Sequence, residues 1–238
     1  MELRLLAVTM LGLLAVSGCS SVDSGYKAGE LGNGGFYFAC SDAVSCARYS
    51  DDAAKFPKAV SIGSSFQVRF VSKTSANDTH ITFNEQAADR GITISPVGEF
   101  ISRGPNGLVA LKTGWATITS RDAAGQLVDF VNIHVAKPDA LVVYDADRVH
   151  SGDTPDRVDA LTLTLSASEP RYLRAFAQEK NSVLAGTLAV EWSRNPEAVV
   201  YLQDNDGKVT VRARKPGTTT LTATGGTFTQ QITIEVKP

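Results

Sequence analysis

Three residues in this chain have a side chain and a spacing suited to chemistry, the thiols of Cys19, Cys40 and Cys46. Cys19 follows small residues at the end of a short apolar segment, residues 5–16, which comes directly after Arg4. Small residues give a processing enzyme access to the backbone, and the thiol is a nucleophile that can become a thioether. Because the segment is too short to cross a bilayer as a helix, residues 1–18 are predicted to be a secretory signal. A secretory signal followed by a chance cysteine is the alternative.

The run Val16-Ser17-Gly18-Cys19 resembles the lipobox of bacterial lipoproteins. The resemblance implies diacylglyceryl attachment to Cys19, cleavage before it and acylation, typically by palmitate, of the new N-terminus. Each buried methylene contributes about 0.8 kcal/mol, so three acyl chains would hold the protein on a membrane. Ser20 stands where an inner-membrane retention signal usually has Asp, so the same resemblance favours the outer membrane.

Cys40 and Cys46 enclose five residues and form an even pair in an exported protein, which predicts a disulfide. The competing interpretation is a redox or metal-binding pair. The spacing matches neither the C-x-x-C redox motif nor the short ligand pairs of zinc sites. We therefore expect the pair to fix the shape of a small loop.

The composition argues against several classes of function. The formal net charge is −2 and the isoelectric point is about 5.9, so the chain lacks the basic field of a nucleic-acid-binding protein. Its three histidines, His80, His134 and His150, are each isolated, and no G-x-S-x-G or Walker motif is present. We therefore expect no enzyme, no resident cofactor and no nucleic-acid partner.

A group of acidic residues could supply oxygen ligands for a Ca²⁺ ion. The group comprises Asp145, Asp147, Asp153, Asp156 and Asp159. Calcium needs six to eight converging oxygens, and this spacing is irregular. A solvated loop is the simpler interpretation, so no metal site is expected.

The remaining chain divides into a tether, a small cap and a longer part with the pattern of β-strands. Residues 19–33 are small and polar, as in a flexible tether, and residues 34–58 contain Phe36-Tyr37-Phe38 and the cysteine loop, as in a small disulfide-pinned cap. Beyond residue 58, apolar and polar residues alternate with a period of two in short runs separated by turns, which predicts an all-β fold. Examples are residues 66–70, 92–94, 131–135, 161–165 and 232–236, and residues 172–180 are also interpreted as a strand.

An internal repeat places a boundary near Pro138. The matching runs are 106–109 with 206–209, 114–119 with 217–222, and 131–138 with 232–238. In the last pair of runs, His134 corresponds to Glu235. The repeat predicts two similar domains, residues 59–138 and 139–238.

The second copy resembles the bacterial immunoglobulin-like domain group 2 (BIG2). The resemblance rests on a tryptophan strand, a glycine turn and a threonine-rich strand, Leu188-Ala189-Val190-Glu191-Trp192-Ser193, Asp206-Gly207-Lys208-Val209-Thr210 and Gly217-Thr218-Thr219-Thr220-Leu221-Thr222-Ala223. The first copy departs from it where Ile94-Ser95 stands for Trp192-Ser193. The family implies tandem immunoglobulin-like sandwiches that serve as adhesive or spacer modules.

The two tryptophans are expected to differ in role. Trp192 shares a strand face with Leu188 and Val190 and should fill a core, whereas Trp115 should face outward. We expect the aromatic cap or the second domain to cover Trp115; the alternative is an exposed ring that contacts a ligand. The sequence thus favours a non-catalytic surface lipoprotein that binds a protein or polysaccharide partner. A carbohydrate- or solute-binding module using Trp115 and the loops is the alternative.

Overall fold

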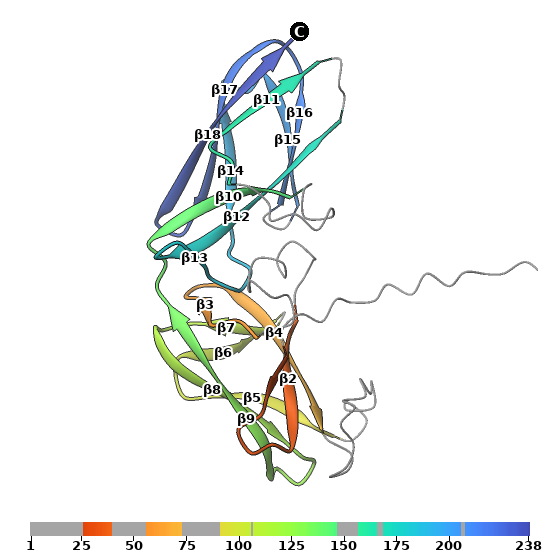
Figure 1. Cartoon of the computed structure of the whole chain (residues 1–238), viewed down its shortest axis with the longest axis vertical. Helices are drawn as coiled ribbons and strands as arrows, with labels where there is room; N and C mark the ends of the chain where they lie inside the picture. Colours follow the sequence, from red (N-terminus) through yellow and green to blue (C-terminus); the bar gives the residue numbers. More distant parts are fainter. Residues whose placement is uncertain are drawn as a thin grey trace, which may run out of the picture.

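The computed structural model describes residues 26–39, 56–72, 91–105, 107–146, 157–165, 169–205 and 208–238. Every regular element in these ranges is a β-strand, which confirms the predicted all-β class. The strands form two lobes along the long axis of the molecule, an N-terminal lobe within residues 26–136 and a C-terminal lobe within residues 140–238 (Figure 1). No helix in these ranges is long and apolar enough to cross a membrane.

The N-terminal lobe consists of two sheets that enclose one apolar cluster. Its strands are β1 (Tyr26–Ala28), β2 (Gly34–Ala39), β3 (Ala59–Ser61), β4 (Ser65–Ser72), β5 (Thr93–Val97), β6 (Ile101–Gly104), β7 (Gly107–Ala110), β8 (Gly114–Arg121) and β9 (Leu127–Ala136). One sheet has the order β1-β2-β4-β7-β6 and the other has the order β3-β9-β8-β5. Alternate residues of both sheets point into the cluster, among them Phe36, Phe38, Ile118 and Ile133.

Strands β1 and β2 differ from the predicted tether and cap. β1 lies inside the segment 19–33, and β2 pairs with β4 within the main sheet rather than in a separate unit. Phe36 and Phe38 are buried in the core, where Phe38 stacks on Phe66 with ring centroids 5.5 Å apart. The reason is apolar burial: these rings supply a large part of the lobe's interior. The first lobe therefore starts before residue 59.

The C-terminal lobe repeats this arrangement. Its strands are β10 (Ala140–Asp145), β11 (Ala160–Thr164), β12 (Arg171–Glu179), β13 (Ser182–Val183), β14 (Glu191–Asn195), β15 (Val200–Asn205), β16 (Lys208–Ala213), β17 (Gly217–Gly225) and β18 (Phe228–Lys237). The sheet β10-β12-β16-β15 faces the sheet β11-β18-β17-β14 across a second apolar cluster. The strand expected over residues 172–180 is confirmed as β12.

The pairing of the strands agrees with the predicted repeat. β3 pairs with β9 in parallel, and β11 pairs with β18 in parallel; the other neighbours in those two sheets are antiparallel. Gly114 and Gly217 open β8 and β17 with φ values of 138° and 143°, and they pair with Val135 and Val236. The same correspondence makes β2 the counterpart of β10, so each lobe has a strand before its parallel edge strand.

Candidate functional site

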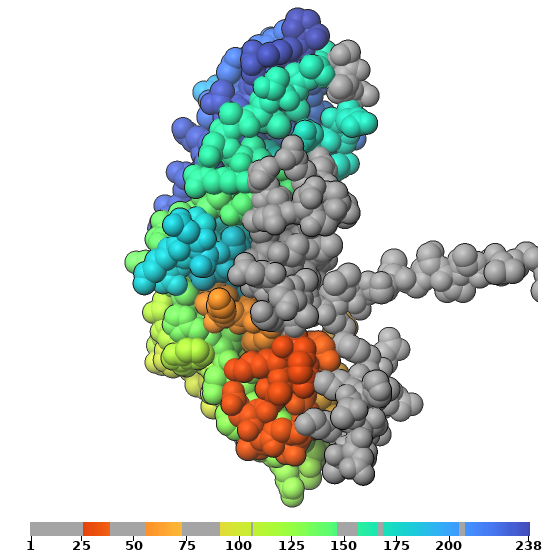
Figure 2. All heavy atoms as spheres, in the orientation of Figure 1, coloured from red at the N-terminus to blue at the C-terminus, as the bar shows by residue number. Residues whose placement is uncertain are grey.

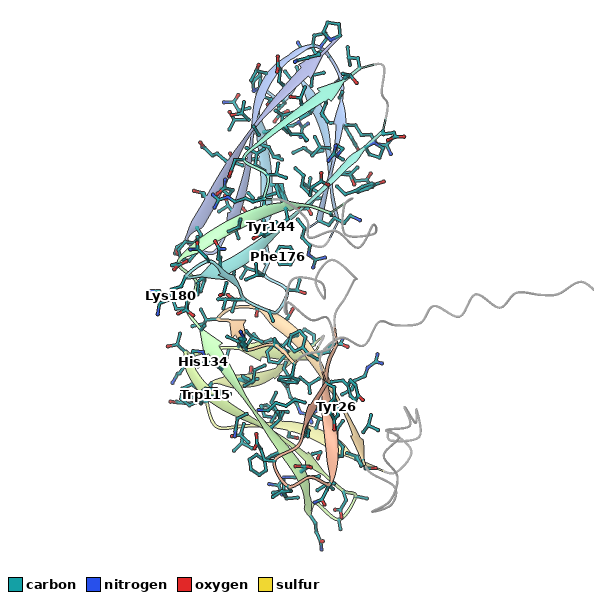
Figure 3. All side chains as sticks on the ribbon, viewed as in Figure 1. Tyr26, Trp115, His134, Tyr144, Phe176 and Lys180 are labelled. Atoms are coloured by element: carbon teal, nitrogen blue, oxygen red, sulfur yellow. The ribbon has the colours of Figure 1, made fainter. Side chains whose placement is uncertain are left out.

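Trp115 is the most exposed large apolar side chain among the described residues. It lies at the second position of β8, and 66% of its surface is exposed. His134 lies opposite it on β9, with the ring centroids 5.2 Å apart and the planes tilted by 49°. Both rings lie on the same side of the N-terminal lobe (Figure 3). The outward orientation of Trp115 is thus confirmed.

The expectation that Trp115 is covered is wrong. The aromatic rings proposed to cover it, Phe36 and Phe38, are on the inner face of the other sheet, inside the core. The C-terminal lobe also leaves the indole exposed. The two phenylalanines do not reach the indole because they pack into the interior of the lobe.

The surface beside Trp115 combines a polar pair with an exposed aliphatic side chain. Thr117 donates a hydrogen bond to Asn132 Oδ1 at 2.7 Å on the next cross-strand pair, and Val97 lies beside Thr117 on β5 and is largely exposed. An exposed indole next to hydrogen-bonding groups can stack on a planar or sugar ring while its neighbours hold hydroxyl groups. The arrangement is suited to stacking on a ligand ring.

The junction of the lobes is the second notable feature. The clamp segment, residues 184–188, leaves the C-terminal lobe and pairs with the N-terminal lobe (Figure 1). The backbone of Ala185 forms two hydrogen bonds with β3, accepting from Ser61 N at 2.9 Å and donating to Ala59 O at 3.0 Å. Two further bonds join Thr187 and Ser65 reciprocally, at 2.7 and 2.9 Å. The lobes are therefore joined by backbone pairing as well as by the linker.

Side chains of the clamp segment complete this junction. Ala185 is buried and belongs to the apolar cluster of the N-terminal lobe, and Leu184 packs in a smaller cluster with Ala136 and Ala177. Gly186 has φ of +96°, and a Cβ atom there would lie 2.1 Å from Ser64 Oγ, so only glycine fits. The space-filling view shows the residues of this region lying against the residues near position 60 (Figure 2).

Asp129 is a third site, which sequence reasoning missed. Its side chain is fully buried and its carboxylate accepts four backbone hydrogen bonds, from Leu31 N at 2.9 Å, Asn33 N at 2.8 Å, Gly34 N at 3.1 Å and Phe130 N at 2.8 Å. Two of these donors lie in the turn between β1 and β2 and a third, Gly34, begins β2, so Asp129 fastens that hairpin to β9. The period-two alternation of β9 could have indicated this site, because it places an acidic residue at an inward-facing position.

Trp192 lies where its sequence pattern predicted. It is half-buried and packs against the apolar cluster of the C-terminal lobe, as do Leu188 and Val190. Its Nε1 atom is buried and has no hydrogen-bond partner among the described residues. Packing, not polar contact, therefore defines its role.

Of the five acidic residues that could bind Ca²⁺, two lie within the described residues and three lie outside them. Asp145 is buried and forms an ion pair with Arg171, and Asp159 pairs with Arg157 at 3.0 Å on the surface. Asp147, Asp153 and Asp156 lie outside the described residues. Within the described ranges, no three His, Cys, Asp or Glu side chains come together to hold a metal ion.

The predicted lipid and disulfide sites fall outside the described residues. The lipid site is Cys19 and the disulfide pair is Cys40 and Cys46. His80 and His150 also lie outside the described residues. Lipidation and the disulfide stay predictions from the sequence.

Comparisons with known proteins give only distant similarities. No family model and no curated protein matches the chain. Among solved structures, the S-layer protein rSbsC is similar at 13% identity and a TM-score of 0.32, over 73% of this chain and 23% of that protein, so the chain spans less than a quarter of it. The Yersinia pseudotuberculosis adhesin InvE is similar at 13% identity and a TM-score of 0.31, over 76% of this chain and 57% of that one. The Escherichia coli adhesin FdeC is similar at 14% identity and a TM-score of 0.29, over 75% and 60%. At such scores the similarities do not establish a common fold.

Proposed function

We propose that this protein is an outer-membrane lipoprotein of the cell envelope that holds two immunoglobulin-like sandwiches of the BIG2 type as one rigid, non-catalytic body, with a structural or adhesive role. The observation that carries the proposal is the clamp segment, which adds backbone hydrogen bonds between the lobes to a short linker. A spacer that sets the distance of a binding surface from a membrane needs such a fixed geometry.

The position of β1 supports placement of the body close to the bilayer. Seven peptide steps separate Cys19 from Tyr26, where β1 begins, and an extended chain of that length reaches about 25 Å at most. Asp129 fastens the β1–β2 turn to β9. A lipid on Cys19 would therefore hold the N-terminal lobe itself near the headgroups, with the C-terminal lobe farther away.

The experiment that tests the anchor compares Cys19→Ala with Cys46→Ala. We expect the wild-type chain and Cys46→Ala to sediment with membranes and to incorporate labelled palmitate, and we expect Cys19→Ala to remain unprocessed, without the label. Label retained by Cys19→Ala would refute the anchor. Sedimentation of wild type without label would refute it equally.

Carbohydrate binding is a second candidate, favoured by the exposed Trp115 beside His134. The test is isothermal titration calorimetry with envelope polysaccharide, comparing wild type, Trp115→Phe and Trp115→Ala. Stacking predicts that the Phe variant retains binding and that the Ala variant loses it. Equal binding by wild type and Trp115→Ala would eliminate this candidate.

A further inference from the structure

The two lobes offer equivalent edge strands, but only one edge has a partner among the described residues. In the N-terminal lobe, Ile62 N donates to Ala136 O at 2.9 Å just after β3. In the C-terminal lobe, Leu165 N donates to Lys237 O at 3.0 Å just after β11. The two hydrogen bonds occupy the same place in the repeat, so β3 and β11 have the same orientation and register against β9 and β18.

This register identifies the backbone groups on the outer side of β11. Val60 pairs with Val135 and Leu163 pairs with Val236, and these pairs correspond in the two lobes. On β3, the outward groups are Ala59 O and Ser61 N, which bind the clamp segment. Since donors and acceptors alternate along a strand, their counterparts on β11 are the carbonyl of Thr162 and the N–H of Thr164.

The outer side of β11 is open in the described part of the chain. β11 is an edge strand of its sheet and pairs there with β18 alone. Leu165, next to it, is 37% exposed, whereas its counterpart Ile62 is partly buried against the N-terminal cluster. A free strand edge beside an exposed apolar side chain is a template for another strand.

We propose that the outer edge of β11 binds an extended polypeptide segment from another protein by β-strand addition. The clamp segment on β3 shows the chemistry that such an edge accepts. It is an extended segment whose small residue, Ala185, exchanges two backbone hydrogen bonds with the edge, followed by a glycine and a β-branched residue. The partner segment would likewise place a small residue against the edge, and it would carry an apolar side chain to cover Leu165.

This inference rests on the proposed adhesive role and names the class of partner that the C-terminal lobe would hold. β11 ends near the C-terminus of the chain, at the end of the molecule away from the N-terminal lobe (Figure 1). A protein held at the membrane through its N-terminal segment would thus offer this edge outward.

The test uses the full chain carrying Cys19→Ala and a synthetic peptide with the sequence of residues 182–188, Ser-Val-Leu-Ala-Gly-Thr-Leu. We expect saturable shifts of the Thr164 and Leu165 amide resonances, and at least tenfold weaker binding for a peptide in which Pro replaces the Ala. Two protein variants sharpen the result. Thr164→Pro removes the outward N–H at an edge position that tolerates proline, and Leu165→Asp places a charge in the contact; each should weaken binding at least tenfold.

Three outcomes would overturn the proposal. These are no saturable shift at millimolar peptide, shifts confined to β3 because the peptide displaces the clamp segment, and self-association of the protein through β11 without peptide. Because the protein in this test carries Cys19→Ala, its failure leaves the lipid anchor untouched. Failure of the palmitate experiment would likewise leave the β11 edge untouched.

Discussion

The contribution of Asp129 can be worked out from its hydrogen bonds. Its Oδ1 accepts from Leu31 N and Phe130 N, and its Oδ2 accepts from Asn33 N and Gly34 N. A hydrogen bond to a charged acceptor contributes about 1.5 to 3 kcal/mol net. Leu31 and Asn33 lie in an exposed turn where water can replace the carboxylate, whereas Gly34 is buried and Phe130 is half-buried. Two bonds of that strength give about 3 to 6 kcal/mol for Asp129→Ala.

The isosteric change is more discriminating. Asp129→Asn keeps one acceptor oxygen and turns an amide group, itself a donor, toward two backbone donors. We expect Asp129→Asn to lower the free energy of unfolding by about 2 to 4 kcal/mol in chemical denaturation. The Asp122 carboxylate accepts a single hydrogen bond, from Gln126 N, in an exposed turn. Asp122→Asn is therefore the matched control and should cost less than about 1 kcal/mol.

Hydrogen exchange gives the local signature of this reasoning. In Asp129→Asn the amides of the β1–β2 turn should lose protection, while those of the C-terminal lobe should keep it. A loss of stability below about 1 kcal/mol, with the Gly34 amide still protected, would refute the role assigned to the carboxylate.

Three further predictions concern the junction, the tryptophans and the cysteines. Gly186→Val should separate the lobes, so calorimetry should show two unfolding transitions; one unshifted transition would refute it. Trp192→Ala should cost about 3 to 5 kcal/mol through a core cavity and Trp115→Ala about 0.5 kcal/mol or less, so equal losses in denaturation would contradict the burial assigned here. Non-reducing mass spectrometry should show Cys40 joined to Cys46, and two free thiols would exclude the disulfide.

Most of the strands could be predicted from the alternation of apolar and polar residues and from the glycines at turns. The strands over residues 131–135 and 232–236 could be predicted because one face of each is buried and the other is solvated. The glycines that open β8 and β17 marked equivalent points of the repeat, since both need positive φ.

The start of the first lobe could not be predicted in the same way. β2 contributes Phe36 and Phe38 to the core, but its aromatic run is partly buried on both faces and shows no alternation; Tyr37 is also buried. Its counterpart β10 is likewise buried at successive positions. Neither strand carried a period-two pattern, so the repeat appeared to begin at residue 59.

The clamp segment and the Asp129 site depend on contacts distant in sequence. Ala185 and Val60 pair through backbone groups that every residue carries, so no residue type announced the contact. The exposure of Trp115 likewise depends on where Phe36 and Phe38 pack, which local patterns do not specify. Each of these features required the arrangement of whole sheets.

The central claim is that the two lobes form one rigid body, and residual dipolar couplings test it most directly. Amide couplings from both lobes of the full chain carrying Cys19→Ala should fit a single alignment tensor, with the relative orientation seen in Figure 1. Separate tensors of different magnitude for the two lobes would show that they move independently, and would contradict the claim.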